Sequence, residues 1–202
     1  MTRSTAITDT AVIGGMSLVY IVMEALDVPK RWSFVVVGVA LLVYGVLIAR
    51  QRTHSLRDLG FRLDTLSAGL LPVGICTLIA SGGLIAWAVV LGRPLLGNQI
   101  LILLALYPIW ATVQQLAFQG LLHRGLTVLL PAPALQVLIT AAAFASVHIG
   151  NSTLVALTFI AGLMWSLLYR RWPNLWLLAG SQTILAALAY PLVLGDAPIS
   201  RL

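Results

Sequence analysis

Acidic residues are scarce in this chain, and their positions restrict the chemistry that it can perform. The six are Asp9, Glu24, Asp27, Asp58, Asp64 and Asp196. Nothing from Thr65 through Gly195 is acidic, although most of the apolar segments lie in that interval. A mechanism that needs a Glu or Asp within the later apolar segments is therefore disfavoured.

Cysteine and histidine are also rare. The single cysteine, Cys76, excludes an internal disulfide, and three scattered histidines do not complete a thiolate metal site. We expect Cys76 to be a small buried side chain. No metal or other cofactor is expected from these residues.

Apolar residues dominate the composition. They make up 60% of the chain, charged residues make up 9%, and the mean hydropathy is +1.00. Twelve Lys and Arg give a net charge of +6, but they fall singly or in pairs between apolar runs. This pattern indicates an integral membrane protein whose charge reflects topology, with no nucleic-acid partner. The first apolar run has no cleavage site for a signal peptidase, so we interpret it as a retained span.

The apolar runs predict an all-α, polytopic transmembrane bundle of about seven to eight membrane helices. Residues 1–202 are interpreted as a single integral membrane domain. Two of the runs are short, and the run that starts at 99 can continue past His123 to Leu130. A half-spanning helix near Pro131 and Pro133 therefore stays open. The predicted spans are 11–27, 33–49, 67–91, 99–122, 134–149, 153–169 and 174–194.

Basic residues in short loops mark the cytoplasmic side of a membrane protein. The predicted spans place two sets on opposite sides: Arg3, Arg50, Arg52, Arg57, Arg62, Arg124, Arg170 and Arg171 against Lys30, Arg31, Arg93 and Arg201. The imbalance predicts a cytoplasmic N-terminus and, for an odd number of spans, an external C-terminus. The plasma membrane is the expected location.

The polar loop 50–64 is expected to lie along the cytoplasmic interface. Its arginines would face anionic lipid while four apolar side chains dip into the headgroup boundary. Those four are Leu56, Leu59, Phe61 and Leu63. Trp32, Trp172 and Trp176 lie at predicted span ends and are interpreted as interfacial anchors.

Three glutamines form the densest polar group within a predicted span. Gln115 and Gln119 are four residues apart and share a helix face, while Gln114 lies about 100° round and can point into an adjacent cleft. Amides exposed to lipid are costly, so all three must face protein or trapped water. A glutamine in a membrane helix is most often a contact between helices, worth about 0.6 kcal/mol and at most about 2 kcal/mol.

Two further polar residues lie in small-residue surroundings. His148 ends the run 141–148, with Phe144 one turn before it on the same face, and Gln182 lies in the last span. A lone His in such a place is usually a neutral, hydrogen-bonded core residue. His54 and His123 are interpreted as loop and interface residues. The residues alone leave open whether Gln114, His148 and Gln182 converge.

Taken in order, these polar positions resemble the motifs of the CPBP or Abi intramembrane proteases, which include the type II CAAX prenyl endopeptidases. The first family motif is Glu-Glu-x-x-x-Arg, commonly extended as Glu-Glu-x-x-Phe-Arg-Gly followed by leucines and a further Arg-Gly. Here it reads Gln114-Gln-Leu-Ala-Phe-Gln-Gly-Leu-Leu-His-Arg-Gly-Leu126. The second motif, Phe-x-x-x-His, is intact from Phe144 to His148. The third, His-x-x-x-Asn after a Leu-Trp, falls on Gln182 and Ala186. The resemblance covers roughly 98–190, and Ser55 to Phe61 also resembles the family's segment before its third span.

The resemblance implies a role for each matched position. By position the catalytic base is Gln114 and its neighbour is Gln115, the arginine is Gln119, the two histidines are His148 and Gln182, and the asparagine is Ala186. In the family the glutamate is thought to activate a water for attack on a peptide bond, with the histidines and asparagine positioning it and stabilising the oxyanion. Only His148 keeps the family's residue type, and a family metal would lack its ligands here.

These replacements predict a degenerate protease. A carboxamide cannot accept a proton from water, and loss of a general base removes a factor of about 10²–10⁴ in rate. Neutralising both the second glutamate and its arginine leaves no unpaired buried ion, which otherwise costs about 3–5 kcal/mol. The leading hypothesis is therefore a protein whose polar cleft binds a peptide, a lipid or a partner transmembrane helix. The alternatives are an active intramembrane endopeptidase that relies on His148, a small transporter, and a structural membrane subunit.

Overall fold

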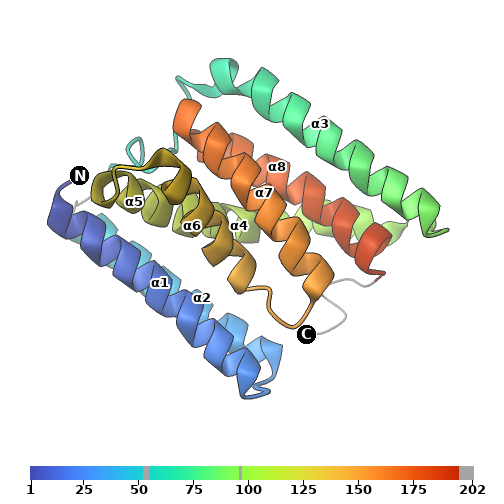
Figure 1. Cartoon of the computed structure of the whole chain (residues 1–202), viewed down its shortest axis with the longest axis horizontal. Helices are drawn as coiled ribbons and strands as arrows, with labels where there is room; N and C mark the ends of the chain where they lie inside the picture. Colours follow the sequence, from blue (N-terminus) through green and yellow to red (C-terminus); the bar gives the residue numbers. More distant parts are fainter. Residues whose placement is uncertain (52–54, 96, 196–202) are drawn as a thin grey trace.

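The computed structural model describes residues 1–51, 55–95 and 97–195, and over those residues every regular element is a helix. The chain forms seven continuous helices in this part, shown in Figure 1. They are α1 (Arg3–Ala25), α2 (Lys30–Gln51), α3 (Leu66–Val90), Asn98–Leu129 (α4, η1 and α5), α6 (Pro133–Ser146), α7 (Ser152–Arg171) and Leu175–Leu194 (α8 and η2).

Six of these helices are long and apolar enough to cross a membrane. The chain is therefore an integral multi-pass membrane protein, as its composition predicts. Helix α6 has only 14 residues, fewer than the roughly 20 that a full crossing needs. The prediction of a full span at 134–149 is wrong, because Pro133 starts the helix at its first position and a turn follows Ser146.

The fourth helix is much longer than the span predicted at 99–122. It runs for 32 residues as α4 (Asn98–Gln115), the π-helical segment η1 (Leu116–His123) and α5 (Arg124–Leu129). The continuation past His123 confirms one of the alternatives that the sequence left open. His123, which was interpreted as an interface residue, lies within this helix near the end of η1 and is 1% exposed. His54 lies outside the described residues.

The helices form a bundle with α1 and α2 along one side and α3 along the opposite edge (Figure 1). Between them, α4 packs against α8 and α6 packs against α7. Glycines allow two of the close approaches. A Cβ at Gly162 on α7 would lie 2.9 Å from the Cα of Ala141 on α6, and one at Gly125 on α5 would lie 2.5 Å from Oγ1 of Thr10 on α1.

Asparagines start the last two long helices. The side chain of Asn151 accepts a hydrogen bond from the Leu154 N–H, and that of Asn174 accepts one from the Leu177 N–H. Each cap satisfies one of the unpaired N–H groups at a helix start, which fixes where α7 and α8 begin. Because Gln182 is on α8, the start of α8 also fixes the height of that side chain in the bundle.

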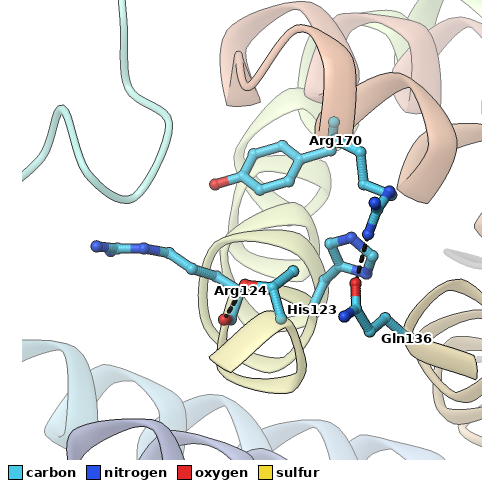
Figure 2. A pocket seen from close by; sticks show the side chains of 6 residues that line it. His123, Arg124, Gln136 and Arg170 are labelled. Atoms are coloured by element: carbon cyan, nitrogen blue, oxygen red, sulfur yellow. Dashed lines mark hydrogen bonds between the residues drawn. The ribbon is translucent and has the colours of Figure 1, made fainter. Parts of the chain in front are cut away.

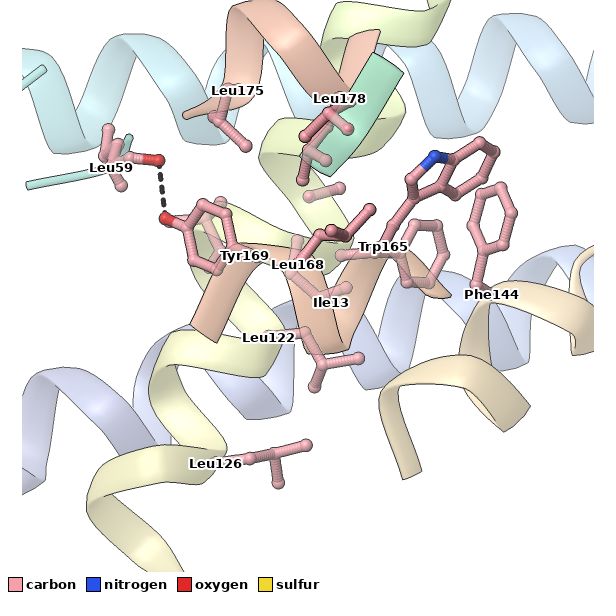
Figure 3. Close-up of a cluster of buried hydrophobic side chains, with 14 of the residues drawn as sticks. Ile13, Leu59, Leu122, Leu126, Phe144, Trp165, Leu168, Tyr169, Leu175 and Leu178 are labelled. Atoms are coloured by element: carbon pink, nitrogen blue, oxygen red, sulfur yellow. Dashed lines mark hydrogen bonds between the residues drawn. The ribbon is translucent and has the colours of Figure 1, made fainter. Parts of the chain in front are cut away.

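The apolar core lies where α1, η1, α6, α7 and α8 meet (Figure 3). Ile13, Leu175 and Leu178 are at most 1% exposed, and the rings of Phe144 and Trp165 fill the space beside them. Large apolar side chains on α2 and α3 are instead widely exposed, as expected for helices that face lipid.

Part of the polar loop before α3 docks onto the protein, so Leu59 and Phe61, which were predicted to dip into the headgroup boundary, contact protein. Leu59 is 4% exposed, and its carbonyl accepts a hydrogen bond of 2.8 Å from the Tyr169 hydroxyl on α7. Gly60 follows with φ +100, where a Cβ would meet Tyr169 at 2.9 Å. Its carbonyl accepts from the Leu175 N–H at 2.7 Å, so the loop is tied to the start of α8.

The other apolar residues of this loop divide into two kinds. Leu56 and Leu63 are 70% and 79% exposed, whereas Phe61 packs edge-on against Trp176 with ring centroids 5.0 Å apart. Beside them Asp64 accepts hydrogen bonds from Arg62 and Arg57. The Arg62 hydrogen bond is the main cause that holds the pKa of the Asp64 carboxyl below its usual value.

Basic residues gather at the two ends of the bundle unequally. One end holds the start of α1, the end of α2, the loop 55–64, α5 and the end of α7, and the other holds the α1–α2 and α3–α4 connections (Figure 1). The first end, here called the basic end, carries Arg3, Arg50, Arg57, Arg62, Arg124, Arg170 and Arg171. The other end carries Lys30, Arg31 and Arg93, while Arg52 and Arg201 lie outside the described residues.

Candidate functional site

Three of the glutamines singled out from the sequence come together at the contact between α4 and α8. Nε2 of Gln115 donates to Oε1 of Gln182 at 2.8 Å, and Nε2 of Gln182 donates to Oε1 of Gln114 at 2.6 Å. The three side chains are 6% (Gln114), 2% (Gln115) and 3% (Gln182) exposed. This group is called the amide cluster below.

The amide cluster differs from the arrangement that helix periodicity predicts. Gln114 does not occupy a cleft of its own, because it shares the partner of Gln115. Neighbouring residues on α4 diverge by about 100°, but the Gln182 carboxamide carries a donor and an acceptor on opposite sides. One side chain of α8 therefore bridges two consecutive residues of α4.

Gln119 lies away from the amide cluster and contacts α7. Its Nε2 donates to Oγ of Ser166 at 3.1 Å. The π-helical segment η1 begins directly after Gln115, and its wider turn changes the direction of the side chains that follow. Two acceptors in this region, Oε1 of Gln115 and Oε1 of Gln119, are buried and receive no hydrogen bond from the described protein atoms.

Hydroxyl groups that the sequence analysis did not single out surround the amide cluster. Oγ of Ser181 is hydrogen-bonded to Oγ1 of Thr77 on α3 at 2.7 Å and accepts from the Trp165 indole on α7 at 3.0 Å. The ring of Tyr107 on α4 packs against the ring of Tyr190, with centroids 6.4 Å apart. Short hydroxyl side chains are common in membrane helices and usually bond to their own backbone, so they carried little signal.

His148 lies in the turn that follows α6. Its Nδ1 is 2.9 Å from the carbonyl oxygen of Phe144, and since a carbonyl can only accept, Nδ1 carries the proton of the neutral ring. The Phe144 ring packs edge-on against His148 and against Trp165, with centroids 5.3 Å and 5.6 Å apart. Trp165 in turn bonds Ser181, the neighbour of Gln182. A chain of aromatic contacts therefore links the second motif to α8.

Ala186 lies one turn after Gln182 on α8. Its methyl group offers no donor or acceptor in place of the family's asparagine side chain. Thus Gln114 has an amide in place of the family's carboxyl, and Gln182 has an amide in place of its imidazole. At position 186 a methyl group replaces the side-chain amide of asparagine.

The amide cluster does not fit a metal ion. The oxygens of Gln114 and Gln182 each already accept an amide hydrogen bond, and a neutral amide is a poor ligand for a transition metal. Over the described residues, no group of three His, Cys, Asp or Glu side chains could hold a metal. What the cluster offers chemically is hydrogen bonding: neutral donors and acceptors with no group that exchanges a proton near neutral pH.

The chain matches no curated protein and no solved structure. Residues 96–188 match the sequence profile of the family described as type II CAAX prenyl endopeptidase Rce1-like. The match contains all of the motif positions discussed above, and it confirms the resemblance found in the sequence. Residues 96–188 therefore form a domain of the Rce1-like type II CAAX prenyl endopeptidase family.

Proposed function

We propose that this protein is a non-cleaving member of its family, which binds a peptide segment or a partner transmembrane helix without hydrolysing it. The observation that carries the proposal is the amide cluster. At the positions where the family places its base and a histidine, two carboxamides are hydrogen-bonded to each other. Neither can take a proton from water, so the step that starts hydrolysis lacks its base.

The charged residues that the family has at positions 115 and 119 are both replaced by amides in this chain. The paired replacement supports a site that has changed as a unit. An isolated glutamate at 115 or an isolated arginine at 119 would be a buried, unpaired ion, because both positions are at most 2% exposed. With amides at both positions, each Nε2 finds a partner on a neighbouring helix. The site is stable without the charges on which catalysis depends.

Two buried acceptors support binding. Oε1 of Gln115 and Oε1 of Gln119 receive no donor from the described protein atoms, and an unpaired buried acceptor costs about 1–3 kcal/mol. A backbone N–H of an entering peptide, or a trapped water, removes that cost. Lipid is the alternative occupant. The excess of arginines at the basic end supports an orientation with that end and the N-terminus in the cytoplasm. The plasma membrane stays the proposed location.

The test is a combined cleavage and crosslinking assay on the purified chain in lipid nanodiscs. Prenylated and unprenylated peptides that carry a photoreactive diazirine are incubated with the native chain and with His148→Ala. We expect crosslinks to α4 and α8 near Gln115 and Gln182, no cleavage products by mass spectrometry, and the same result with the variant. Products that form with the native chain and disappear with His148→Ala contradict the proposal.

The second candidate is an active endopeptidase that uses His148. One observation favours it: the hydrogen bond from Nδ1 to the Phe144 carbonyl selects the tautomer with its lone pair on Nε2. This is the form that a general base requires. The cleavage arm of the same assay separates the two candidates, because only this one needs the imidazole.

A further inference from the structure

A cavity of about 350 Å³ opens at the basic end of the bundle, apart from the amide cluster. It is here called the basic pocket, and Figure 2 shows the side chains that line it. They come from the end of η1 and from α5, α6 and α7: His123, Arg124, Thr127, Gln136, Tyr169 and Arg170. Two of the six are arginines and none is acidic, so the lining favours an anion.

His123 presents an unused acceptor to the basic pocket. Its Nδ1 is 3.0 Å from Oγ1 of Thr140. The Thr140 hydroxyl donates its only proton in a hydrogen bond to the carbonyl oxygen of Gln136 at 2.8 Å. Thr140 can therefore only accept, so Nδ1–H donates and the lone pair of the neutral ring is on Nε2. Nε2 is buried and has no hydrogen-bond partner among the described residues.

Arg170 is held beside this imidazole by a second fixed side chain. Its Nη1 donates to Oε1 of Gln136, as the dashed line in Figure 2 shows. Gln136 is in turn fixed because its Nε2 donates to the carbonyl of Leu130 at 2.7 Å. A guanidinium has five N–H donors, and the bond to Gln136 occupies one of them. Arg124 also lines the cavity, but its side chain extends away from His123 and Arg170 (Figure 2) and adds positive charge at the rim.

We propose that the basic pocket binds a phosphate monoester group. Two phosphate oxygens accept hydrogen bonds from the remaining N–H donors of Arg170, since one guanidinium can bind two oxygens of a phosphate side by side. The pocket binds the monoanion of the monoester, which is the main form below about pH 6: its third oxygen keeps a proton and donates a hydrogen bond to Nε2 of His123. The pocket thus supplies donors for two oxygens and an acceptor for the third.

The acceptor makes the site selective. A phosphate diester, as in most anionic lipid headgroups, has no P–OH and leaves Nε2 unpaired, whereas a monoester satisfies it. A site with a buried polar group rejects a ligand that lacks the matching partner. The same monoester chemistry is offered by a lipid with a terminal phosphate and by free phosphate, and a pocket at the end of a membrane bundle is open to either source.

The test measures binding to the full chain in nanodiscs of neutral lipid. One arm adds inorganic phosphate, a second incorporates phosphatidic acid, and a third incorporates phosphatidylglycerol as the diester control; binding is read by native mass spectrometry and by calorimetry. We expect at least one monoester probe to bind about tenfold or more tightly than the diester. Binding of phosphatidic acid alone identifies a lipid ligand, and binding of inorganic phosphate identifies a soluble one.

Matched variants locate the site. Arg170→Gln is expected to weaken monoester binding about tenfold, whereas Arg171→Gln, which removes the neighbouring arginine outside the pocket, leaves it unchanged. Both arginines are exposed, so thermal unfolding should be similar in the two variants. Equal affinity for monoester and diester, no binding of either monoester, or equal effects of the two substitutions overturns the proposal. The comparison of probes on the native chain needs no variant.

Discussion

The amide cluster and the basic pocket are both built from buried polar side chains. The side chains of the amide cluster bond to one another, whereas those of the basic pocket border a cavity. In the amide cluster Gln182 joins Gln114 and Gln115 by two direct bonds, and all three side chains are at most 6% exposed. In the basic pocket His123 and Gln136 are just as buried, yet they border a cavity of about 350 Å³ with an arginine at its edge.

This contrast separates two uses of polarity within a membrane protein. Polar groups that satisfy one another across two helices hold those helices together, and among the described residues of the amide cluster they leave one unpaired acceptor, Oε1 of Gln115, for a ligand. Polar groups that are held in place by hydrogen bonds to the protein on one side and border a cavity on the other are preorganised to bind a ligand. We therefore expect substitutions in the amide cluster to change the stability of the bundle as well as peptide binding, and substitutions in the basic pocket to change mainly anion binding.

The largest effect on stability is expected for Gln182→Leu. This change removes both hydrogen bonds of the amide cluster and strands buried atoms on Gln114 and Gln115, so the free energy of unfolding should fall by about 2–3 kcal/mol. Denaturant titration in bicelles measures it, with Ile184→Ala on the exposed face of α8 as the control. The triple Leu variant at 114, 115 and 182 should recover part of the loss, since no unpaired amide remains. An equal loss in the single and triple variants would count against the amide cluster as a bonded unit.

Gly162→Ala is expected to lower the free energy of unfolding by a smaller amount and also to weaken binding at the basic pocket. The added Cβ meets the Ala141 backbone at 2.9 Å, so α6 and α7 must separate and the free energy of unfolding should fall by about 1–2 kcal/mol. Because Gln136 and Arg170 lie on those two helices, monoester binding should weaken as well. Gly83→Ala, where nothing lies within 4 Å, should be neutral or stabilising by up to about 1 kcal/mol. Similar effects of the two substitutions would remove the packing explanation.

Gln119→Leu should change the free energy of unfolding by less than about 1 kcal/mol. It removes one bond to Ser166 but also removes a buried oxygen that has no donor, and the two changes oppose each other. The same titration compares it with Gln182→Leu. A loss as large as that of Gln182→Leu would place Gln119 functionally within the amide cluster.

The smallest effect concerns the exposed ion pairs at the basic end. The hydrogen bond from Arg62, with a further contribution from Arg57, lowers the folded-state pKa of Asp64. The stabilisation by this carboxylate is therefore present above its unfolded pKa and is lost as the pH falls through the folded value. Thermal unfolding between about pH 2 and pH 6 should show a weak decline on acidification that Asp64→Asn reduces. An unchanged slope in the variant would assign the decline to other groups.

The sequence predicted the helical membrane architecture and the family, but not the three-dimensional partners. The apolar runs predict the membrane helices, including the continuation of the fourth one past His123. The motif spacing predicts the family and assigns Gln182 to a motif position. The burial of His123 was not predicted, because its ring is hydrogen-bonded to Thr140, which lies on another helix. Leu59 was misplaced for the same reason, since the loop contacts that bury it come from Tyr169 on α7.

The convergence of the amides illustrates the same limit. Periodicity placed Gln114 and Gln115 in different directions, and only the position of α8 explains why both meet Gln182. The π-helical segment after Gln115 has no signature in the sequence, although it redirects Gln119 toward Ser166.

The most direct test of the central claim, an uncharged protease site that does not cut, compares the native chain with one in which the family's residues are restored. The restored chain carries Gln114→Glu, Gln115→Glu, Gln119→Arg, Gln182→His and Ala186→Asn, and both proteins are assayed in nanodiscs with the same prenylated peptides by mass spectrometry. The account predicts cleavage products from the restored chain and none from the native chain. Products from the native chain at a rate equal to or above that of the restored chain would contradict it.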